Sequence, residues 1–152
     1  MIVTEWDNLV ATSYYETIST IEERIKQYDY DEALIGLEHL YENMAKKDKR
    51  EFRAFLKLLI MHILKWKIQP EKRSISWTKT IRNARNEIEI ILEDTPTVNK
   101  KYIEEIWQKT FELAVKDARY DMNFSKKEQQ NFNPEMLTWQ EVFEDEYYLE
   151  ND

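Results

Sequence analysis

The chain has 152 residues with one glycine, three prolines, no cysteine and a formal net charge of -8. This length suits one domain with a real core, and so little glycine and proline nearly excludes an all-β fold. With Gly36 as the single glycine, glycine-rich phosphate-binding loops are excluded too. The absence of cysteine excludes disulfides, thiolate metal sites and thiol nucleophiles. Because the first residues also lack the basic region of a signal peptide, we expect a cytoplasmic location.

Apolar residues recur at helical spacing along most of the chain, after a short piece around Trp6. Ser13 and Glu16 form a capping-box pattern at the start of the first long helix, and Pro70 stops the third. The expected helices span residues 13–28, Asp29 or Asp31 to about Ala45, about Asp48 to Gln69, Ser74 or Ser76 to Asp94, and about Asn99 to Met122.

The third helix is apolar on nearly every side between Phe55 and Leu64, which indicates a central, enclosed helix. A polar stretch, residues 123–133, comes before a short last helix that starts with a second capping box at Thr138. An acidic, aromatic tail over residues 143–152 closes the chain. We therefore predict an all-α fold, a single domain over residues 1–152 in which about five main helices and a short C-terminal helix form a bundle.

Charge is segregated along the chain. Residues 46–85 carry thirteen Lys and Arg against three Asp and Glu, a net charge of +10, whereas residues 1–45 carry -8 and residues 86–152 carry -10. One interpretation is that the basic middle binds an anion such as a nucleic-acid backbone or a phosphate. The other is that the acidic ends pack beside the basic middle and neutralise it within the fold.

One dense segment carries a recognisable pattern. It contains, in order, His62, Lys65, Trp66, Gln69, Pro70, Glu71, Arg73, Ser74, Ser76, Trp77, Thr80, Ile81 and Arg85. This pattern resembles the central signature of the bacterial domain-of-unknown-function family number 29, and the match is specific over residues 56–96. The chain departs from that family at Ala45, where a glycine is common. The resemblance implies a small all-helical domain and supplies no activity.

His62 borders the apolar stripe of the third helix, where it serves either as a hydrogen-bonded core residue or as a functional base. Arg73, beside hydroxyl groups and the free N–H groups of a helix start, forms either an anion seat or an ordinary capped turn. The candidate binding residues of this segment are Lys65, Gln69, Glu71, Arg73, Ser74, Ser76, Trp77 and Arg85.

Arg85 flanks the apolar stripe of the fourth helix and needs a partner if partly buried, for which Asp117 and Asp121 of the fifth helix are candidates. Together with His62 these residues form either a catalytic cluster or a lock that fixes the helix register. No metal site and no cofactor are expected, because His39 falls on the outer face of the second helix and no paired Glu-x-x-His motif is present.

Three functions remain open. The first, which we favour, is a non-enzymatic binding module whose basic central segment meets an anionic ligand, a nucleic acid or an acidic protein. The second is a hydrolase-like enzyme for a phosphate-containing substrate with His62 at its centre. The third is a structural helical protein that docks a partner or a second copy of itself as a homodimer. No membrane partner is expected, since the chain has no apolar run of transmembrane length.

Overall fold

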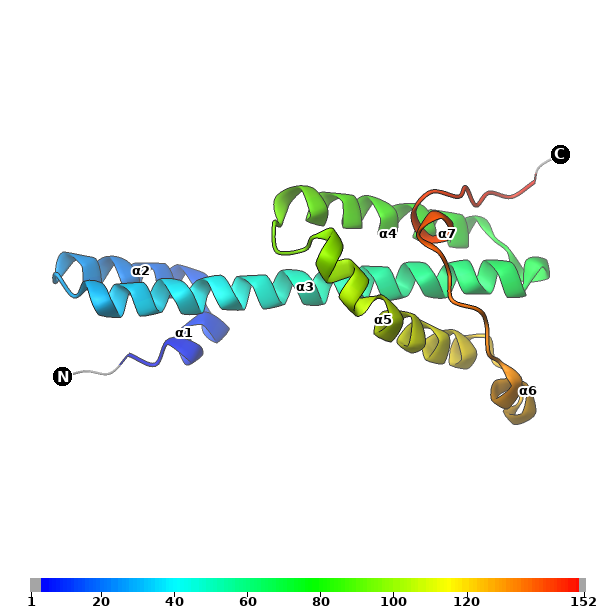
Figure 1. Cartoon of the computed structure of the whole chain (residues 1–152), viewed down its shortest axis with the longest axis horizontal. Helices are drawn as coiled ribbons and strands as arrows, with labels where there is room; N and C mark the ends of the chain where they lie inside the picture. The colour runs from blue at the N-terminus through cyan, green and yellow to red at the C-terminus, as the bar shows by residue number, and fades with distance from the viewer. Residues whose placement is uncertain (1–3, 151–152) are drawn as a thin grey trace. The chain divides into compact units, whose positions relative to one another are not determined.

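The computed structural model describes residues 4–150 and confirms the all-α fold, since those residues form helices and no strand. No helix in this part of the chain has both the length and the apolar character needed to cross a membrane. The helices are α1 (Trp6–Thr12), α2 (Tyr14–Lys26), α3 (Tyr30–Ile68), the 3-10 helix η1 (Pro70–Lys72), α4 (Ile75–Asp94), α5 (Lys100–Asp121), α6 (Lys126–Asn131) and α7 (Trp139–Phe143) (Figure 1).

Contacts group the chain into two compact units, Met1–Asp48 and Lys49–Asp152, here called the N-terminal unit and the C-terminal unit. Helix α3 supplies residues to both. We describe each unit by itself, and the single domain over residues 1–152 stays a prediction.

The second and third predicted helices are in fact one continuous helix, α3, of 39 residues. We predicted that one helix ends at about Ala45 and the next begins at about Asp48. That prediction is wrong, because Ala and Lys are good helix formers and neither Pro nor Gly interrupts the run. The other end is as predicted, since α3 stops at Ile68, two residues before Pro70.

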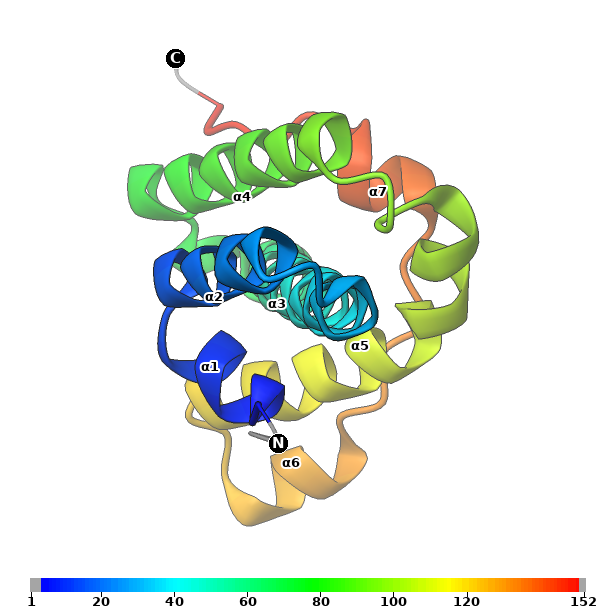
Figure 2. The same ribbon diagram turned by 90° about the vertical axis from the view of Figure 1, so that its left-hand side faces the viewer.

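The N-terminal unit packs α1 and α2 against the first part of α3 (Figure 2). Its buried cluster is small and consists of Trp6, Ile21 and Ala33. The packing depends on Gly36, because a Cβ atom there would lie 2.6 Å from Cη2 of Trp6 and 2.8 Å from Cγ1 of Ile21. Any side chain at position 36 would therefore force the Trp6 ring or Ile21 to shift.

The side chain of His39, which we predicted on an outer face, is 34% exposed, and its Nδ1 lies 2.9 Å from Oδ1 of Asp7, an exposed residue of α1. The short piece around Trp6, for which we predicted no helix, forms the helix α1 and packs on this side of α3.

The C-terminal unit has a larger core centred on the second part of α3. As predicted, this stretch of helix is enclosed, and α4 and α5 lie along different sides of it in both views (Figures 1 and 2). The fully buried α3 side chains include Phe52, Leu56, Leu59, Ile60, Ile63 and Leu64. Helix α4 contributes Ile81, Ala84 and Ile88, and α5 contributes Ile103, Ala114 and Ala118.

The C-terminal segment completes this core. Leu137 and Val142 are buried, and Phe143 and Tyr147 pack against the same cluster. The acidic tail that we expected to close the chain therefore lies partly against the core, since its aromatic side chains pack there. The polar stretch over residues 123–133 contains one more helix than predicted, α6, which begins with a capping box at Ser125.

Local capping signals place most helix starts. The side chains of Ser13, Ser74 and Asn99 each accept a hydrogen bond from the backbone N–H three residues later. The capping box predicted at Thr138 and Glu141 is formed in both directions. These caps agree with the sequence because each uses groups within three residues of one another.

Candidate functional site

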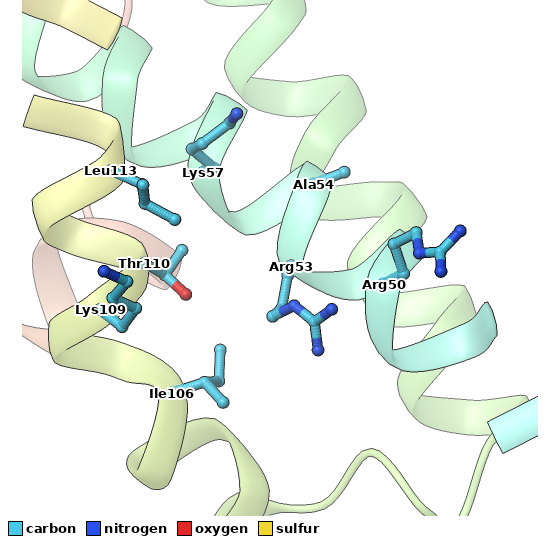
Figure 3. A pocket seen from close by; sticks show the side chains of 8 residues that line it. All are labelled: Arg50, Arg53, Ala54, Lys57, Ile106, Lys109, Thr110 and Leu113. Carbon is cyan, nitrogen blue, oxygen red and sulfur yellow. The ribbon is translucent and has the colours of Figure 1, made fainter. Parts of the chain in front are cut away.

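A pocket of about 300 Å³ opens between α3 and α5 within the C-terminal unit (Figure 3). It is lined by Arg50, Arg53, Ala54, Lys57, Ile106, Lys109, Thr110 and Leu113. We call it the basic pocket, because four of its eight lining side chains are cationic near neutral pH and none is a carboxylate. Its surface is otherwise mostly apolar, with Ala54 on α3 and Ile106 and Leu113 on α5.

Polar contacts between α3 and α5 hold the two walls of the pocket. Arg53 Nη1 donates a 2.8 Å hydrogen bond to the hydroxyl of Tyr102, and Lys57 Nζ lies 3.0 Å from Oδ2 of Asp117. Further along α3, Lys65 pairs with Asp121. Since these contacts join two helices that are themselves packed through the core, the fold holds the side chains of Arg53 and Lys57 in place.

The charge of the pocket is only partly neutralised. Within residues 4–150, Lys57 is the only one of the four cations in an ion pair. Arg50, Arg53 and Lys109 are exposed, so their charges remain open to solvent and to an incoming group. The pocket thus combines an apolar floor with a net positive rim, an arrangement that can hold a negatively charged group beside an apolar one.

Part of the basic segment is neutralised within the fold, as the second interpretation of the charge pattern proposed. Lys57 pairs with Asp117, Lys65 with Asp121, and Lys67 with Glu141. Each acid lies C-terminal to the basic segment. The second interpretation therefore holds for these three lysines, whereas anion binding by the other cations stays a prediction.

Lys65 is one of the few charged residues that this fold buries. It is 8% exposed, pairs with Asp121, and places Nζ 4.8 Å from the centre of the Trp77 ring. A buried ammonium group between a carboxylate and an aromatic face is held as a structural element, because both partners belong to the same fold.

His62 also has a local role. Its Nδ1 lies 3.0 Å from the carbonyl oxygen of Leu58, and because a carbonyl only accepts, Nδ1 carries the proton and donates. Burial lowers the pKa of His62, and the nearby Lys65 lowers it further, while the hydrogen bond to Leu58 and the charge of Asp121 act in the opposite direction. The hydrogen bond that orients this ring therefore comes from its own helix, not from Asp117 or Asp121.

In the turn after α3, candidate binding residues make their contacts with other groups of the same chain. Arg73 Nε donates a 2.8 Å hydrogen bond to the carbonyl oxygen of Trp66, and its guanidinium lies 4.7 Å from the centre of the Trp66 ring. Ser74 caps α4 by accepting from the N–H of Trp77. Gln69 is buried, whereas Glu71 and Ser76 are exposed at the two ends of this turn.

The surroundings of Arg73 are mixed in charge. A pocket of about 410 Å³ beside it is also lined by Glu146 and Glu150. Two carboxylates next to one guanidinium oppose the binding of a further anion. The basic pocket has the stronger positive field of the two.

Arg85 has partners that the sequence did not indicate. Its Nε donates a 2.8 Å hydrogen bond to the carbonyl oxygen of Val142, and Nη2 lies 3.3 Å from that of Glu141. The guanidinium also lies 5.4 Å from the centre of the Tyr147 ring. The predicted contact of Arg85 with Asp117 or Asp121 is wrong. Those acids pair with Lys57 and Lys65, and the guanidinium of Arg85 bonds to carbonyl groups of the C-terminal segment instead.

The result is a polar clasp on the C-terminal segment, made by Arg85, Lys67, Glu141 and Tyr147. The Tyr147 hydroxyl donates a 2.6 Å hydrogen bond to the carbonyl oxygen of Glu141, and burial raises the pKa of Tyr147 to about 12. The bond with Lys67 lowers the pKa of the Glu141 carboxyl. These contacts tie the C-terminal segment to α3 and α4, and of the proposed cluster of His62, Arg85, Asp117 and Asp121 only Arg85 takes part in them.

The residues of the basic pocket were not among the candidate site residues. Arg50, Arg53 and Lys57 follow one another at spacings of three and four, which places them on one helix face, and this signal was readable from the sequence. Lys109 lies more than fifty residues later, so its approach to the same pocket depends on the packing of α5 on α3. Among residues 4–150, no group of three His, Asp or Glu side chains is placed to hold a metal ion.

Comparison with known proteins gives a family and no activity. No curated protein and no solved structure matches the chain significantly. The family model described as "Domain of unknown function DUF29" matches residues 10–148, which takes in α2 to α7 and the basic pocket. With nearly its whole length matched, this all-helical chain belongs to the DUF29 family.

Proposed function

We propose that this protein is a non-enzymatic binding module whose basic central segment meets an anionic partner at the basic pocket. The observation that carries this proposal is a lining of four cations without a carboxylate, in a chain whose net charge is -8. Such a local concentration of positive charge on an acidic protein attracts negative groups to one place.

The chemistry of the lining favours binding over catalysis. Its polar groups are the guanidinium groups of Arg50 and Arg53, the ammonium groups of Lys57 and Lys109, and the hydroxyl of Thr110. Guanidinium and ammonium groups hold phosphates and carboxylates through charge-assisted hydrogen bonds. A general base needs a pKa near the working pH, and none of these side-chain types has one in its ordinary state.

The proposal is tested by fluorescence anisotropy with three labelled probes: an acidic peptide that also contains leucine, a short single-stranded oligonucleotide, and polyphosphate. The pocket variant Arg50→Ala/Lys109→Ala is compared with Lys79→Ala/Arg82→Ala, which removes the same charge from exposed positions of α4. We expect at least one probe to bind the wild type, and the pocket variant to weaken binding about tenfold or more, because each lost charged hydrogen bond costs about 1.5–3 kcal/mol.

Binding that weakens between about 50 and about 200 mM salt would support the charge-based attraction. Equal losses in the two variants would mean that the probes respond to overall charge and not to the pocket. If no probe binds the wild type at low salt, the proposal is wrong.

A further inference from the structure

The N-terminal unit exposes a stripe of large apolar side chains on α3. Leu34 is 56% exposed, Leu37 48%, Tyr41 64% and Met44 44%. These four residues are spaced by three and four positions along the helix. Because an α-helix rotates by about 100° per residue, such spacings place all four side chains on one face. Ala33 and Gly36, which lie against the Trp6 cluster, belong to another face.

The neighbouring helix α2 adds to the exposed apolar surface of this unit with Ile18 and Ile25, 44% and 45% exposed. With a large side chain offering roughly 200 Å², the four of the α3 stripe, each about half exposed, present about 400 Å². This lies within the ~300–600 Å² range of the largest apolar patch of a typical monomer and is about half of the ~800 Å² that each partner buries in a standard interface. A surface of that size is suited to a protein partner.

Acidic residues follow one edge of the α3 stripe. Asp31, Glu38 and Glu42 are all exposed, and Glu38 lies four residues after Leu34 and three before Tyr41. Residues 1–45 as a whole carry a net charge of -8. The exposed face of the N-terminal unit is therefore that of an acidic amphipathic helix.

This face is matched in chemistry by the basic pocket, which has an apolar floor and a cationic rim. We infer that a second copy of this chain docks the Leu34–Met44 face of its N-terminal unit into the basic pocket of the first. The inference rests on the proposed function and names the partner. It places apolar side chains against Ile106 and Leu113, and the carboxylates of Glu38 and Glu42 against Arg50, Arg53 and Lys109.

Charge favours this pairing over a symmetric pairing of two N-terminal units. A symmetric contact of the stripe with its own copy would bring the acidic edges Glu38 and Glu42 of both copies to the same interface, and like charges in contact are strongly unfavourable. The pocket volume of about 300 Å³ equals that of about ten water molecules at ~30 Å³ each, which is enough for a leucine or tyrosine side chain. A contact between different surfaces of two copies is a head-to-tail contact. Repeated from copy to copy, it forms either a closed ring or an open filament.

The experiment is sedimentation velocity of the full chain over a range of concentrations at low and moderate salt. Two variants are used: a stripe variant, Leu37→Asp/Tyr41→Asp, and a pocket variant, Arg50→Glu/Lys109→Glu. We expect the wild type to associate, more weakly as salt rises, and each variant alone to lose association by at least tenfold. All four positions are exposed, and circular dichroism checks that both variants remain folded.

Mixing the two variants is the decisive step. The stripe variant keeps an intact pocket and the pocket variant keeps an intact stripe, so the mixture is expected to form a one-to-one complex. A symmetric contact between two N-terminal units would survive in the pocket variant and would not be restored by mixing. Either of those results, or a wild type that stays monomeric at every concentration, overturns the inference.

The same stripe variant separates this inference from the proposed function. If it binds the acidic peptide probe while the wild type does not self-associate, the pocket binds anions but its partner is another molecule. If neither the peptide nor a second copy binds, the proposed function fails as well. Should the folded state of the stripe variant be in doubt, Leu37→Ser/Tyr41→Ser is the milder replacement.

Discussion

Helix α3 contributes residues to both units and carries apolar side chains at helical spacing in each. These side chains are exposed in one unit and buried in the other. In the N-terminal unit Leu34 and Leu37 are about half exposed, whereas in the C-terminal unit Leu56 and Leu59 are fully buried. The difference lies in what surrounds the helix: α1 and α2 cover one part of it, whereas α4, α5 and the C-terminal segment share the core of the other. An apolar helical stripe thus predicts a buried or a binding face, and the neighbouring helices decide which.

The sharpest way to test this difference is to shorten a leucine in each unit. Leu59→Ala is expected to destabilise the protein by about 3 kcal/mol, because it removes a fully buried side chain and leaves a cavity. Leu37→Ala is expected to change stability by less than about 0.5 kcal/mol, since that side chain is exposed. Urea unfolding followed by circular dichroism measures both, and equal effects would contradict the exposure of the stripe.

The polar clasp of the C-terminal unit gives the next largest effect. Arg85→Ala removes the donors to the carbonyl groups of Val142 and Glu141, which is expected to cost about 2 kcal/mol. Arg82→Ala, three residues earlier and exposed, is the matched control. Hydrogen exchange should show faster exchange over residues 137–147 in the first variant alone, and unchanged exchange there would mean that the clasp does not hold the segment.

In the N-terminal unit the corresponding weak point is Gly36. Gly36→Ala pushes a methyl group against Trp6 and Ile21, an overpacking cost of about 2 kcal/mol that the better helix propensity of alanine offsets by about 1 kcal/mol. The net loss should appear as faster exchange in α1 and α2. A second change, Trp6→Leu, makes room and should reduce the cost of Gly36→Ala. If the two changes are simply additive, the close approach is not the cause.

The smallest effect concerns pH. Burial lowers the pKa of His62 from its ordinary value of 6.5, so the unfolded chain binds this proton more readily than the folded one. The stability contributed by neutral His62 is therefore complete above pH 6.5 and is lost as pH falls from there through the lowered pKa. His62→Gln should flatten the decrease in the free energy of unfolding as pH falls below 6.5, measured by urea unfolding at a series of pH values.

Much of the fold was predictable from local sequence. The helix starts at Asn99 and Thr138 were correct, and of the two alternatives Ser74 and Ser76 the structure has Ser74, because a cap depends on groups within one helical turn. The break predicted near Ala45 was wrong, because a polar run without Pro or Gly gives the backbone no reason to leave the helix. We predicted no helix in the polar stretch over residues 123–133, where α6 lies. Ser125 and Glu128 nevertheless carry the same capping pattern as Thr138 and Glu141.

The candidate site was less predictable. The sequence indicated that residues 46–85 are basic and that His62, Arg73 and Arg85 belong to a dense motif. It did not indicate that Arg85 holds the C-terminal segment, or that Lys109 joins Arg50 at one pocket. These contacts join residues about fifty to sixty positions apart along the chain, and helical periodicity carries no information about such distances.

By itself, the sequence determined an all-helical chain, the ends of most of its helices and a basic middle between acidic ends, because these follow from propensity, capping and composition. Only the tertiary structure decided which cations are neutralised and which remain free. Lys57, Lys65 and Lys67 meet carboxylates of the C-terminal part, while Arg50 and Lys109 line the basic pocket. The physical reason is that the charge on a side chain is set by its type, whereas its partner is set by the packing of helices distant in sequence.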